Sequence, residues 1–343
     1  MSTPALLWKA LTDHDVQCQL CAHFCVIKPG QRGRCGVREN RDGELFTLVH
    51  DAVAALNLDP VEKKPLFHFL PGTTALSLGT PGCNLACAFC QNASLSQTPR
   101  ESGRIEGERI PPQDLVRTAL RQKAASMAYT YSEPTIFFEL MRETAELAQK
   151  EGLQNIMVSN GFQSPACLDA LDGLIQAANI DIKAFTEHFY RDVCSARLAP
   201  VLKNLSHIRR LGWHLEVTTL IIPELNDSDQ ELTDIARFVV RELGADVPWH
   251  VSRFHGCYRM ADHPSTPLDT LKRAYDIGRA EGLHYVFVGN VPGSDLENTI
   301  CPGCGHVVIE RAGFTIRRTR LTDGCCNSCG RVIIKPEHLG RNL

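Results

Sequence analysis

Between residues 74 and 288, the spacing of apolar residues alternates between the pattern of a buried strand and the pattern of a helix. Short apolar runs typical of buried strands occur at 74–78, 127–131, 155–159, 178–182, 214–222, 249–254 and 284–288. Segments with apolar residues at helical spacing, such as 113–126 and 135–150, separate most of these runs. Strand and helix alternating in this way predict a parallel sheet. The pattern therefore predicts an α/β fold built as a partial or full (β/α) barrel.

The cysteines add a second kind of unit. The chain has 15 of them, an odd number that excludes a full set of disulfides. They gather within 18–35, 83–90 and 301–329, and clustered cysteines of a cytosolic protein more often bind metal than pair with one another. The three that stand alone are interpreted as small core or surface residues: Cys167, Cys194 and Cys257.

The N-terminal cysteines form a C-x2-C-x3-C-x9-C set made of Cys18, Cys21, Cys25 and Cys35. Four thiols in one short segment can close a tetrahedral metal site. Zinc is the first choice, and an auxiliary iron–sulfur cluster is the alternative, because ligand spacing separates the two poorly. His23 is left out, since a lone histidine near such a loop is more often solvated.

Two C-x2-C-G knuckles at 301–305 and 326–330 are typical of a zinc ribbon. The predicted ligands are Cys301, Cys304, Cys326 and Cys329, with Cys325 spare. Metal binding would supply folding free energy to a segment with little apolar surface. Between the knuckles lie four arginines that could contact an acidic partner or RNA, although a solvated strand face is the preferred interpretation: Arg311, Arg317, Arg318 and Arg320.

These units predict three domains. Residues 1–45 form a metal-binding module, 46–295 the barrel and 296–343 a zinc-ribbon-like module. Hydrophobic residues at 43% and charged residues at 22% indicate neither disorder nor a membrane span. The first residues lack a basic stretch followed by an apolar core, so we expect a cytoplasmic protein without a membrane partner. The net charge of −3 argues against nucleic acid as a partner.

The stretch between the first module and the repeating strands is rich in proline. Pro60, Pro65 and Pro71 predict an extended loop rather than a helix. Its charged residues and His68 could face the active site, but a solvated loop is the preferred interpretation.

The residues most informative about chemistry are Cys83, Cys87 and Cys90, which stand in C-x3-C-x2-C spacing just after the first predicted strand. A closed structural zinc site takes four protein ligands, whereas three thiolates on a 4Fe–4S cluster leave one iron open. The alternative is a zinc loop or three packed thiols. This spacing resembles that of the radical S-adenosylmethionine (SAM) enzymes. The resemblance implies that the open iron binds SAM and that an electron from the cluster cleaves it to a 5′-deoxyadenosyl radical.

Polar residues follow the next three predicted strands where each ends. They are Glu133 after the second, Ser159, Asn160 and Gly161 after the third, and Asp181 and Lys183 after the fourth. In a (β/α) barrel these ends meet at one mouth, where catalytic groups collect. Each residue taken singly is also compatible with an ordinary turn or helix cap.

From residue 72 to 290 the chain resembles the pyruvate formate-lyase activating enzyme branch of the radical SAM superfamily. The resemblance implies that Phe89 lies beside the adenine and that Glu133 binds the amino group of SAM, although the motif is YSEP rather than Gly-Gly-Glu. It also implies that four residues lie around the SAM carboxylate or an associated monovalent cation: Ser159, Asn160, Asp181 and Lys183. It implies a place near the ribose for His250.

Over almost its whole length the chain resembles the AmmeMemoRadiSam system radical SAM proteins. The stretches that carry this likeness include CQLCAHFC, DPVEKKPLFHFLPG, GTPGCNLACAFCQN and YVFVGNVPG. The resemblance implies Memo-like and AMMECR-like partner proteins, and an electron donor such as flavodoxin or ferredoxin. It does not supply a substrate.

The leading hypothesis is therefore a radical SAM enzyme that cleaves SAM reductively and abstracts hydrogen from an unidentified substrate. The first alternative is an activase that abstracts hydrogen from a backbone glycine of a glycyl radical enzyme. The second is a zinc-ribbon adaptor for RNA or protein, in which the barrel is a remnant. The intact cysteine triad argues against the adaptor.

Overall fold

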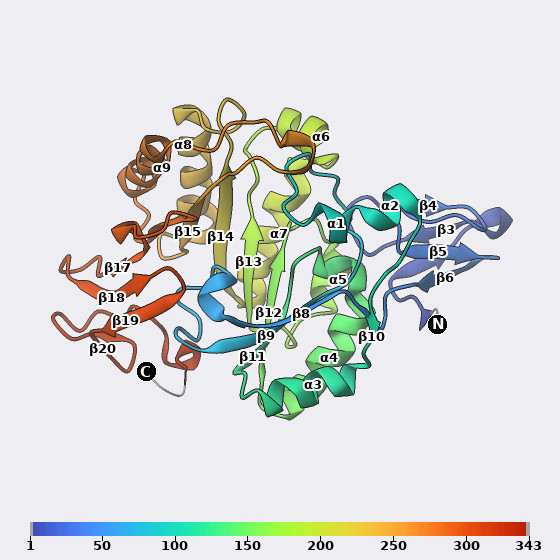
Figure 1. The fold of residues 1–343 in the computed structure, drawn as a ribbon, viewed down its shortest axis with the longest axis horizontal. Coiled ribbons are helices and arrows are strands. Elements are labelled where there is room, and N and C mark those ends of the chain that lie inside the picture. The colour runs from blue at the N-terminus through green and yellow to red at the C-terminus, as the bar shows by residue number, and fades with distance from the viewer. Residues whose placement is uncertain (1–2, 341–343) are drawn as a thin grey trace.

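The computed structural model describes residues 3–340. Its centre is an eight-stranded sheet with strand order β16-β15-β14-β13-β12-β11-β9-β8 (Figure 1). The strands are β8 (Ala55–Pro60), β9 (Thr74–Gly79), β11 (Ser126–Tyr129), β12 (Gln154–Ser159), β13 (Ala177–Asp181), β14 (His214–Ile221), β15 (Trp249–Arg253) and β16 (Val286–Gly289). All are parallel to their neighbours except β8, which pairs antiparallel with β9.

Each predicted apolar run from residue 74 onward has become a strand of this sheet, within a few residues of the expected bounds. The confirmed fold class is thus α/β with a parallel-strand sheet. Within residues 3–340 the hydrogen-bonded order ends at β16 on one side and at β8 on the other. Closure into a barrel stays a prediction.

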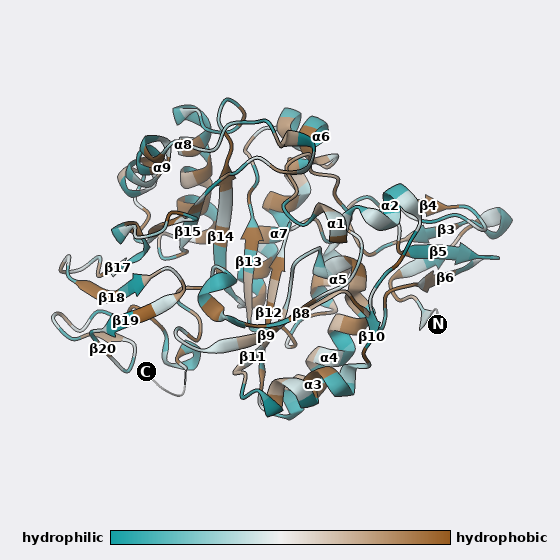
Figure 2. Cartoon of the chain, viewed as in Figure 1, coloured by the Kyte–Doolittle hydropathy of each residue, from teal (hydrophilic) through white to brown (hydrophobic). Residues whose placement is uncertain are grey.

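Helices connect the parallel strands and bury one side of their surface. They are α3 (Pro112–Arg121), α4 (Phe138–Lys150), α5 (Pro165–Asp169), α6 (Glu187–Cys194), α7 (Leu198–Leu211), α8 (Asp229–Phe238) and α9 (Leu268–Ala280). In α4, Leu140 and Met141 are fully buried while Lys150 is exposed. Figure 2 shows the same mixture of hydrophobic and hydrophilic residues around α3 and α4. This amphipathic pattern is why helical spacing was visible in the sequence.

Small sheets flank the central one. In the N-terminal segment, β1 (Thr3–Pro4), β6 (Glu44–Thr47) and β5 (Arg38–Arg41) form one sheet, and β2 (Trp8–Ala10), β3 (Val16–Cys18) and β4 (Val26–Ile27) form another. At the other end, β17 (Thr299–Ile300), β18 (Val307–Ala312) and β19 (Thr315–Thr319) form a sheet, and β20 (Leu321–Thr322) pairs with β21 (Cys325–Cys326). Strand β6 runs across the predicted boundary at residue 45. The division into three domains stays a prediction.

Two short helices, α1 (Ala93–Ser96) and α2 (Thr98–Ser102), follow the cysteine triad, and β10 (Glu108–Arg109) then pairs with β7 (Ala52–Val53). None of the helices in residues 3–340 combines the length and the apolar character that a membrane span needs.

The proline-rich stretch is buried rather than solvated, which corrects the preferred interpretation. Phe67 and His68 are 6% and 3% exposed, and the backbone N–H of His68 donates to Glu216 Oε1 over 2.7 Å. The ring of Phe67 packs edge-on against His250, 4.8 Å between centroids. The segment therefore fills space beside β14 and β15, where a proline-fixed backbone needs few internal hydrogen bonds.

Arg311 of β18 covers this segment, and it is neither solvated nor free for a partner. It is 5% exposed, it donates to the carbonyl oxygen of Phe67 over 2.9 Å, and its guanidinium lies 4.2 Å from the centre of the Phe67 ring. The C-terminal segment is thus anchored to the central sheet through a buried cation. The other arginines of this group are exposed, as preferred: Arg317, Arg318 and Arg320.

Candidate functional site

The loop after β9 carries the cysteine triad. Cys83 and Cys87 are each 8% exposed and Cys90 is half-buried. The end of α6 holds the middle of this loop, because the N–H groups of Ala86 and Ala88 donate to the carbonyl oxygens of Cys194 and Val193 over 3.0 and 2.9 Å. The loop therefore has a fixed backbone path, along which two of its three thiols are buried.

The three thiols interact electrostatically. Burial raises the pKa of Cys83, and the negative charges of Glu133 and of a Cys87 thiolate raise it further. The pKa of Cys87 is lowered, first by a hydrogen bond from the thiol of Cys194 and also by the positive charge of Lys183, although burial opposes the change. Three thiolates would repel one another without a positively charged centre between them. The donor set is thus suited to a metal centre.

Asn160 ties the end of β12 to this loop. Its side-chain amide donates to Asn84 Oδ1 over 2.7 Å and lies 3.8 Å from Cys83 Sγ. The amide nitrogen of Asn84 is buried and has no hydrogen-bond partner within the described chain. A buried polar atom of this kind is costly unless something else binds it. The sequence analysis did not single out Asn84, whose importance rests on this contact between distant segments.

Glu133 is fully buried and caps the 3₁₀ turn η3 (Pro134–Phe137). Its carboxylate accepts hydrogen bonds from the Thr135 N–H (3.0 Å) and hydroxyl (2.5 Å), the Ser159 hydroxyl (2.7 Å) and the Asn160 N–H (2.9 Å). Burial raises the pKa of Glu133, and these donors counteract it. In the structure this carboxylate fastens the segment after β11 to the end of β12. Its contact with a SAM amino group stays a prediction.

Lys183 places a largely enclosed cation, with its side chain 14% exposed, beside the loop. Its Nζ lies 2.8 Å from Asp181 Oδ2 and 5.7 Å from the centre of the Phe89 ring. Burial alone would lower the pKa of Lys183, but the Asp181 carboxylate and a thiolate at Cys87 raise it well above its usual value. The Lys183 N–H also donates to Tyr190 Oη over 3.0 Å, which fixes the backbone here. Lys183 thus lies close to both Asp181 and Phe89. The roles of these three residues toward SAM stay predictions.

His250 is buried in the central sheet beside Glu216. Its Nε2 is 2.6 Å from Glu216 Oε2, while His214 Nε2 is 3.0 Å from the other oxygen of the same carboxylate. Although burial opposes it, these two histidines hold the pKa of Glu216 well below its usual range. In residues 3–340 no contact found for His250 joins it to the cysteine loop. A role near the ribose stays a prediction.

Sequence comparison agrees with this geometry. Residues 77–239, from β9 through α8, match the radical SAM superfamily. These residues form a radical SAM superfamily domain. The chain is 42% identical over 331 residues to the uncharacterized protein MJ0808 of Methanocaldococcus jannaschii, covering 96% of this chain and 98% of that one.

Two more distant similarities are also found. The benzylsuccinate synthase activating enzyme of Thauera aromatica is 22% identical over 213 residues, which cover 56% of this chain and 64% of that enzyme. The structure of Streptococcus suis SuiB bound to its precursor peptide SuiA superposes with a TM-score of 0.50 at 14% identity, covering 68% of this chain and 52% of SuiB. This structural likeness supports the fold alone.

The radical SAM protein is thus an enzyme, and its superfamily implies a 4Fe–4S cluster and SAM as cofactors. The residues present fit both. Three thiols suit the cluster, and a largely enclosed lysine and an unpartnered asparagine amide next to them suit a ligand with a carboxylate. Which side chains contact SAM stays a prediction.

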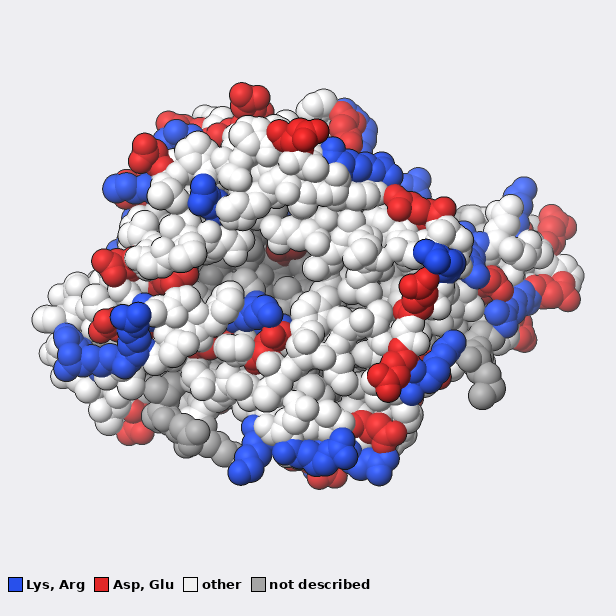
Figure 3. All heavy atoms as spheres, viewed as in Figure 1, with Lys and Arg blue, Asp and Glu red and all other residues white. Residues whose placement is uncertain are grey.

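A cavity of about 790 Å³ lies beside the cysteine loop of the radical SAM domain, between β8, α1 and β10. Pro81 and Asn92 of the loop line it together with Asn57 and Tyr131. The side-chain amide of Asn92 donates to the carbonyl oxygen of Tyr131 over 2.7 Å, which joins the wall to the loop. A separate hollow near the middle of the face drawn in Figure 3 lies over the end of β13.

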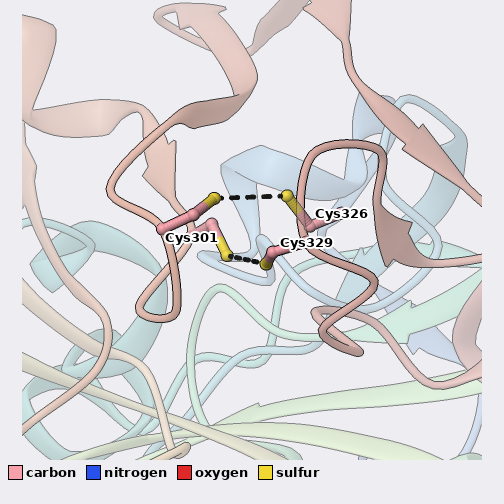
Figure 4. Close-up of side chains that lie close together, drawn as sticks. Cys301, Cys326 and Cys329 are labelled. Carbon is pink, nitrogen blue, oxygen red and sulfur yellow. Dashed lines mark hydrogen bonds between the residues drawn. The ribbon is translucent and has the colours of Figure 1, made fainter.

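The C-terminal knuckles bring four sulfurs together. Those of Cys301, Cys304, Cys326 and Cys329 all lie within 4.8 Å of one another, and Figure 4 shows two facing pairs. The sulfurs of Cys301 and Cys329 are 3.5 Å apart, and those of Cys304 and Cys326 are 3.6 Å apart. Cys325 lies outside this group, with its thiol 3.8 Å from the carbonyl oxygen of Asp323.

Sequence reasoning treated Cys194 as a lone core residue. The structure shows it fully buried, and its thiol interacts with that of Cys87 and lowers the pKa of Cys87. No local signal marks this residue, because the contact forms only when the end of α6 packs on the loop after β9.

Proposed function

We propose that the protein cleaves SAM reductively at a 4Fe–4S cluster held by Cys83, Cys87 and Cys90 and abstracts hydrogen from a substrate carbon. The observation that carries this proposal is the position of three thiols, two buried and one half-buried, on one loop after β9, beside the Asp181–Lys183 pair. When bound, the cluster would supply the electron that cleaves SAM to methionine and a 5′-deoxyadenosyl radical.

The residues around the loop would orient SAM and keep water away from it. Lys183 would attract the SAM carboxylate, and Phe89 would lie against its adenine. Asn160 holds Asn84, and with it the loop, in place. A dry, oriented pocket matters because the radical would otherwise react with whatever lies near it.

The test is product formation. The protein, reconstituted anaerobically and reduced with dithionite, is expected to release 5′-deoxyadenosine and methionine from SAM, and Cys83→Ala to release neither. Cys325→Ser is the matched control, because Cys325 lies outside both sulfur groups, and it should behave as wild type. Unchanged release in Cys83→Ala would contradict the assignment.

The C-terminal sulfur group supports a second proposal, a structural zinc ion bound by Cys301, Cys304, Cys326 and Cys329. A tetrahedral zinc with Zn–S bonds of about 2.3 Å separates its sulfurs by about 3.8 Å, close to the two facing distances found here. Through Arg311 such a site would stabilise the cover over Phe67. Cys326→Ala should lose about one zinc per chain, while Cys325→Ser should keep it.

The likeness to the benzylsuccinate synthase activating enzyme supports activation of a glycyl radical enzyme as a second candidate function. Proteins of this kind need an electron donor, for which flavodoxin or ferredoxin is proposed. A glycine-centred EPR signal on a partner polypeptide would favour this function over the use of a small substrate.

The motifs along the whole chain support membership of the AmmeMemoRadiSam system, with Memo-like and AMMECR-like partners. Co-purification of the tagged protein with these two proteins would detect the association. Washing the complex at increasing salt concentration would measure how firmly it holds. Absence of binding under anaerobic conditions with SAM present would contradict it.

A further inference from the structure

The four N-terminal cysteines form one interacting group. Cys18 ends β3, and its N–H donates to the carbonyl oxygen of Cys25 over 2.9 Å. Cys18 and Cys35 are buried, and Cys21 and Cys25 are half-buried. Four thiols gathered in one short, largely enclosed segment make a ligand set on chemical grounds.

Their spacing differs from that of the C-terminal group. Four thiolates on one zinc lie about 3.8 Å apart, as the Zn–S bond length of about 2.3 Å requires. The C-terminal sulfurs meet this condition. In the described part of the chain, no three of the N-terminal sulfurs come within 4.8 Å of one another. Thiolates around a four-iron cluster are held farther apart than those around a single ion, because each binds a different iron.

A buried arginine supports the same ligand set. Arg38 is 1% exposed, and its Nη1 donates to Cys18 Sγ over 3.2 Å. Its charge is balanced by Glu139, with which its Nη2 forms a buried ion pair. A guanidinium directed at a sulfur is a donor for a thiolate, and hydrogen bonds to ligand sulfurs are a means by which proteins set the potential of iron–sulfur clusters.

The N-terminal group adjoins the catalytic loop. His23 Nε2 lies 2.9 Å from the carbonyl oxygen of Asn84. Arg100 bridges the two segments, donating to the carbonyl oxygens of Arg34 (2.9 Å) and Cys83 (3.0 Å).

Gly82 allows the closest approach between the two segments. Its φ is +104°, and an added Cβ would lie 3.0 Å from the carbonyl oxygen of Cys35 and 2.7 Å from Val37. Only glycine fits this position without displacing the N-terminal segment.

We propose that Cys18, Cys21, Cys25 and Cys35 bind a second 4Fe–4S cluster, which passes single electrons to the cluster at Cys83, Cys87 and Cys90. In each transfer a one-electron protein donor of the flavodoxin or ferredoxin class is oxidised and the N-terminal cluster is reduced by one electron. That electron then reduces the catalytic cluster, and no bond or proton changes place. The relay rests on the proposed function, whereas the presence of the second cluster does not.

The first experiment counts metals in a chain that lacks the catalytic triad. Cys83→Ala/Cys87→Ala/Cys90→Ala, reconstituted anaerobically, should keep about four irons and four sulfides per chain and about one zinc. Its reduced form should give the EPR signal of a 4Fe–4S cluster. Loss of all iron with about two zinc per chain would overturn the proposal.

Wild-type protein provides a measurement that does not depend on the folding of that variant. It should contain about eight irons and one zinc per chain, and Cys325→Ser should match it. About four irons and two zinc would place zinc at the N-terminal site and overturn the proposal.

The second experiment tests the relay. Cys18→Ser/Cys21→Ser should lower flavodoxin-driven release of 5′-deoxyadenosine by about tenfold or more, while dithionite-driven release stays within about twofold of wild type. Equal loss with both reductants, or none with either, would overturn the relay. If wild type releases no 5′-deoxyadenosine at all, the proposed function fails, and the iron content of the triple variant still decides whether the second cluster exists.

Discussion

The carbonyl oxygen of Cys194 accepts a hydrogen bond from the N–H of Ala86 over 3.0 Å, which fixes the end of α6 on the cysteine loop, and the thiol of Cys194 lowers the pKa of Cys87. We interpret Cys194 as a hydrogen-bond donor to the Cys87 thiolate rather than as a ligand. Cys194→Ala should therefore keep the wild-type iron content and shift the midpoint potential of the catalytic cluster to a more negative value, because a donor to a ligand sulfur is lost. Metal analysis and an EPR-monitored redox titration measure both. A variant that loses about four irons would instead make Cys194 a ligand.

Glu133 is expected to be a strong contributor to stability, because it accepts four hydrogen bonds from buried donors. Glu133→Ala leaves those donors unpaired and should lower the free energy of unfolding by about 2–4 kcal/mol. Glu146→Ala is the matched control on α4, since its side chain is 43% exposed and its ion pair with Arg142 is worth under about 1 kcal/mol. Urea titration under anaerobic conditions compares the two. Equal effects would contradict the structural role given to Glu133.

Lys183→Met should weaken SAM binding by about tenfold or more, because it removes a largely enclosed cation that has no other cationic neighbour in the contacts described here. Iron content should be retained, since Lys183 is not a ligand. Lys203→Met, on the exposed side of α7, should bind SAM as wild type does. Equilibrium dialysis with labelled SAM measures the affinity. Unchanged affinity in Lys183→Met would place the SAM carboxylate elsewhere.

Because His68 is buried, the free energy of unfolding should fall when the pH is lowered into the mildly acid range. Burial lowers the pKa of His68 from 6.5 to about 3 in the folded chain. Between these two values the unfolded chain binds a proton that the folded chain does not, so stability is complete above pH 6.5 and falls with pH by up to about 1.4 kcal/mol per unit.

His68→Gln removes this contribution and should flatten the fall in the free energy of unfolding between pH 6.5 and 5.5. The exposed His255→Gln is the control and should follow wild type. If the free energies of unfolding of His68→Gln and wild type fall in parallel with pH, the ring of His68 is not held neutral.

The sheet could be predicted because its information is local. Each parallel strand is buried on both faces, so its apolar run is visible without knowing its neighbours. The same holds for the loop at Cys83, whose three cysteines lie within eight residues. The burial of Arg311 and His68 could not be predicted, because it depends on the packing of segments more than 200 residues apart. The packing of Cys194 on the cysteine loop also depends on segments far apart in the chain, so it could not be predicted either.

The central claim is that three cysteines leave one iron of the catalytic cluster for SAM. Pulsed EPR of the reduced protein with SAM labelled at its carboxylate by ¹⁷O tests this most directly. The account predicts a hyperfine coupling between the label and the cluster, which Lys183→Met weakens and Cys83→Ala abolishes. A reduced cluster at Cys83, Cys87 and Cys90 that shows no coupling while SAM is bound would contradict the account.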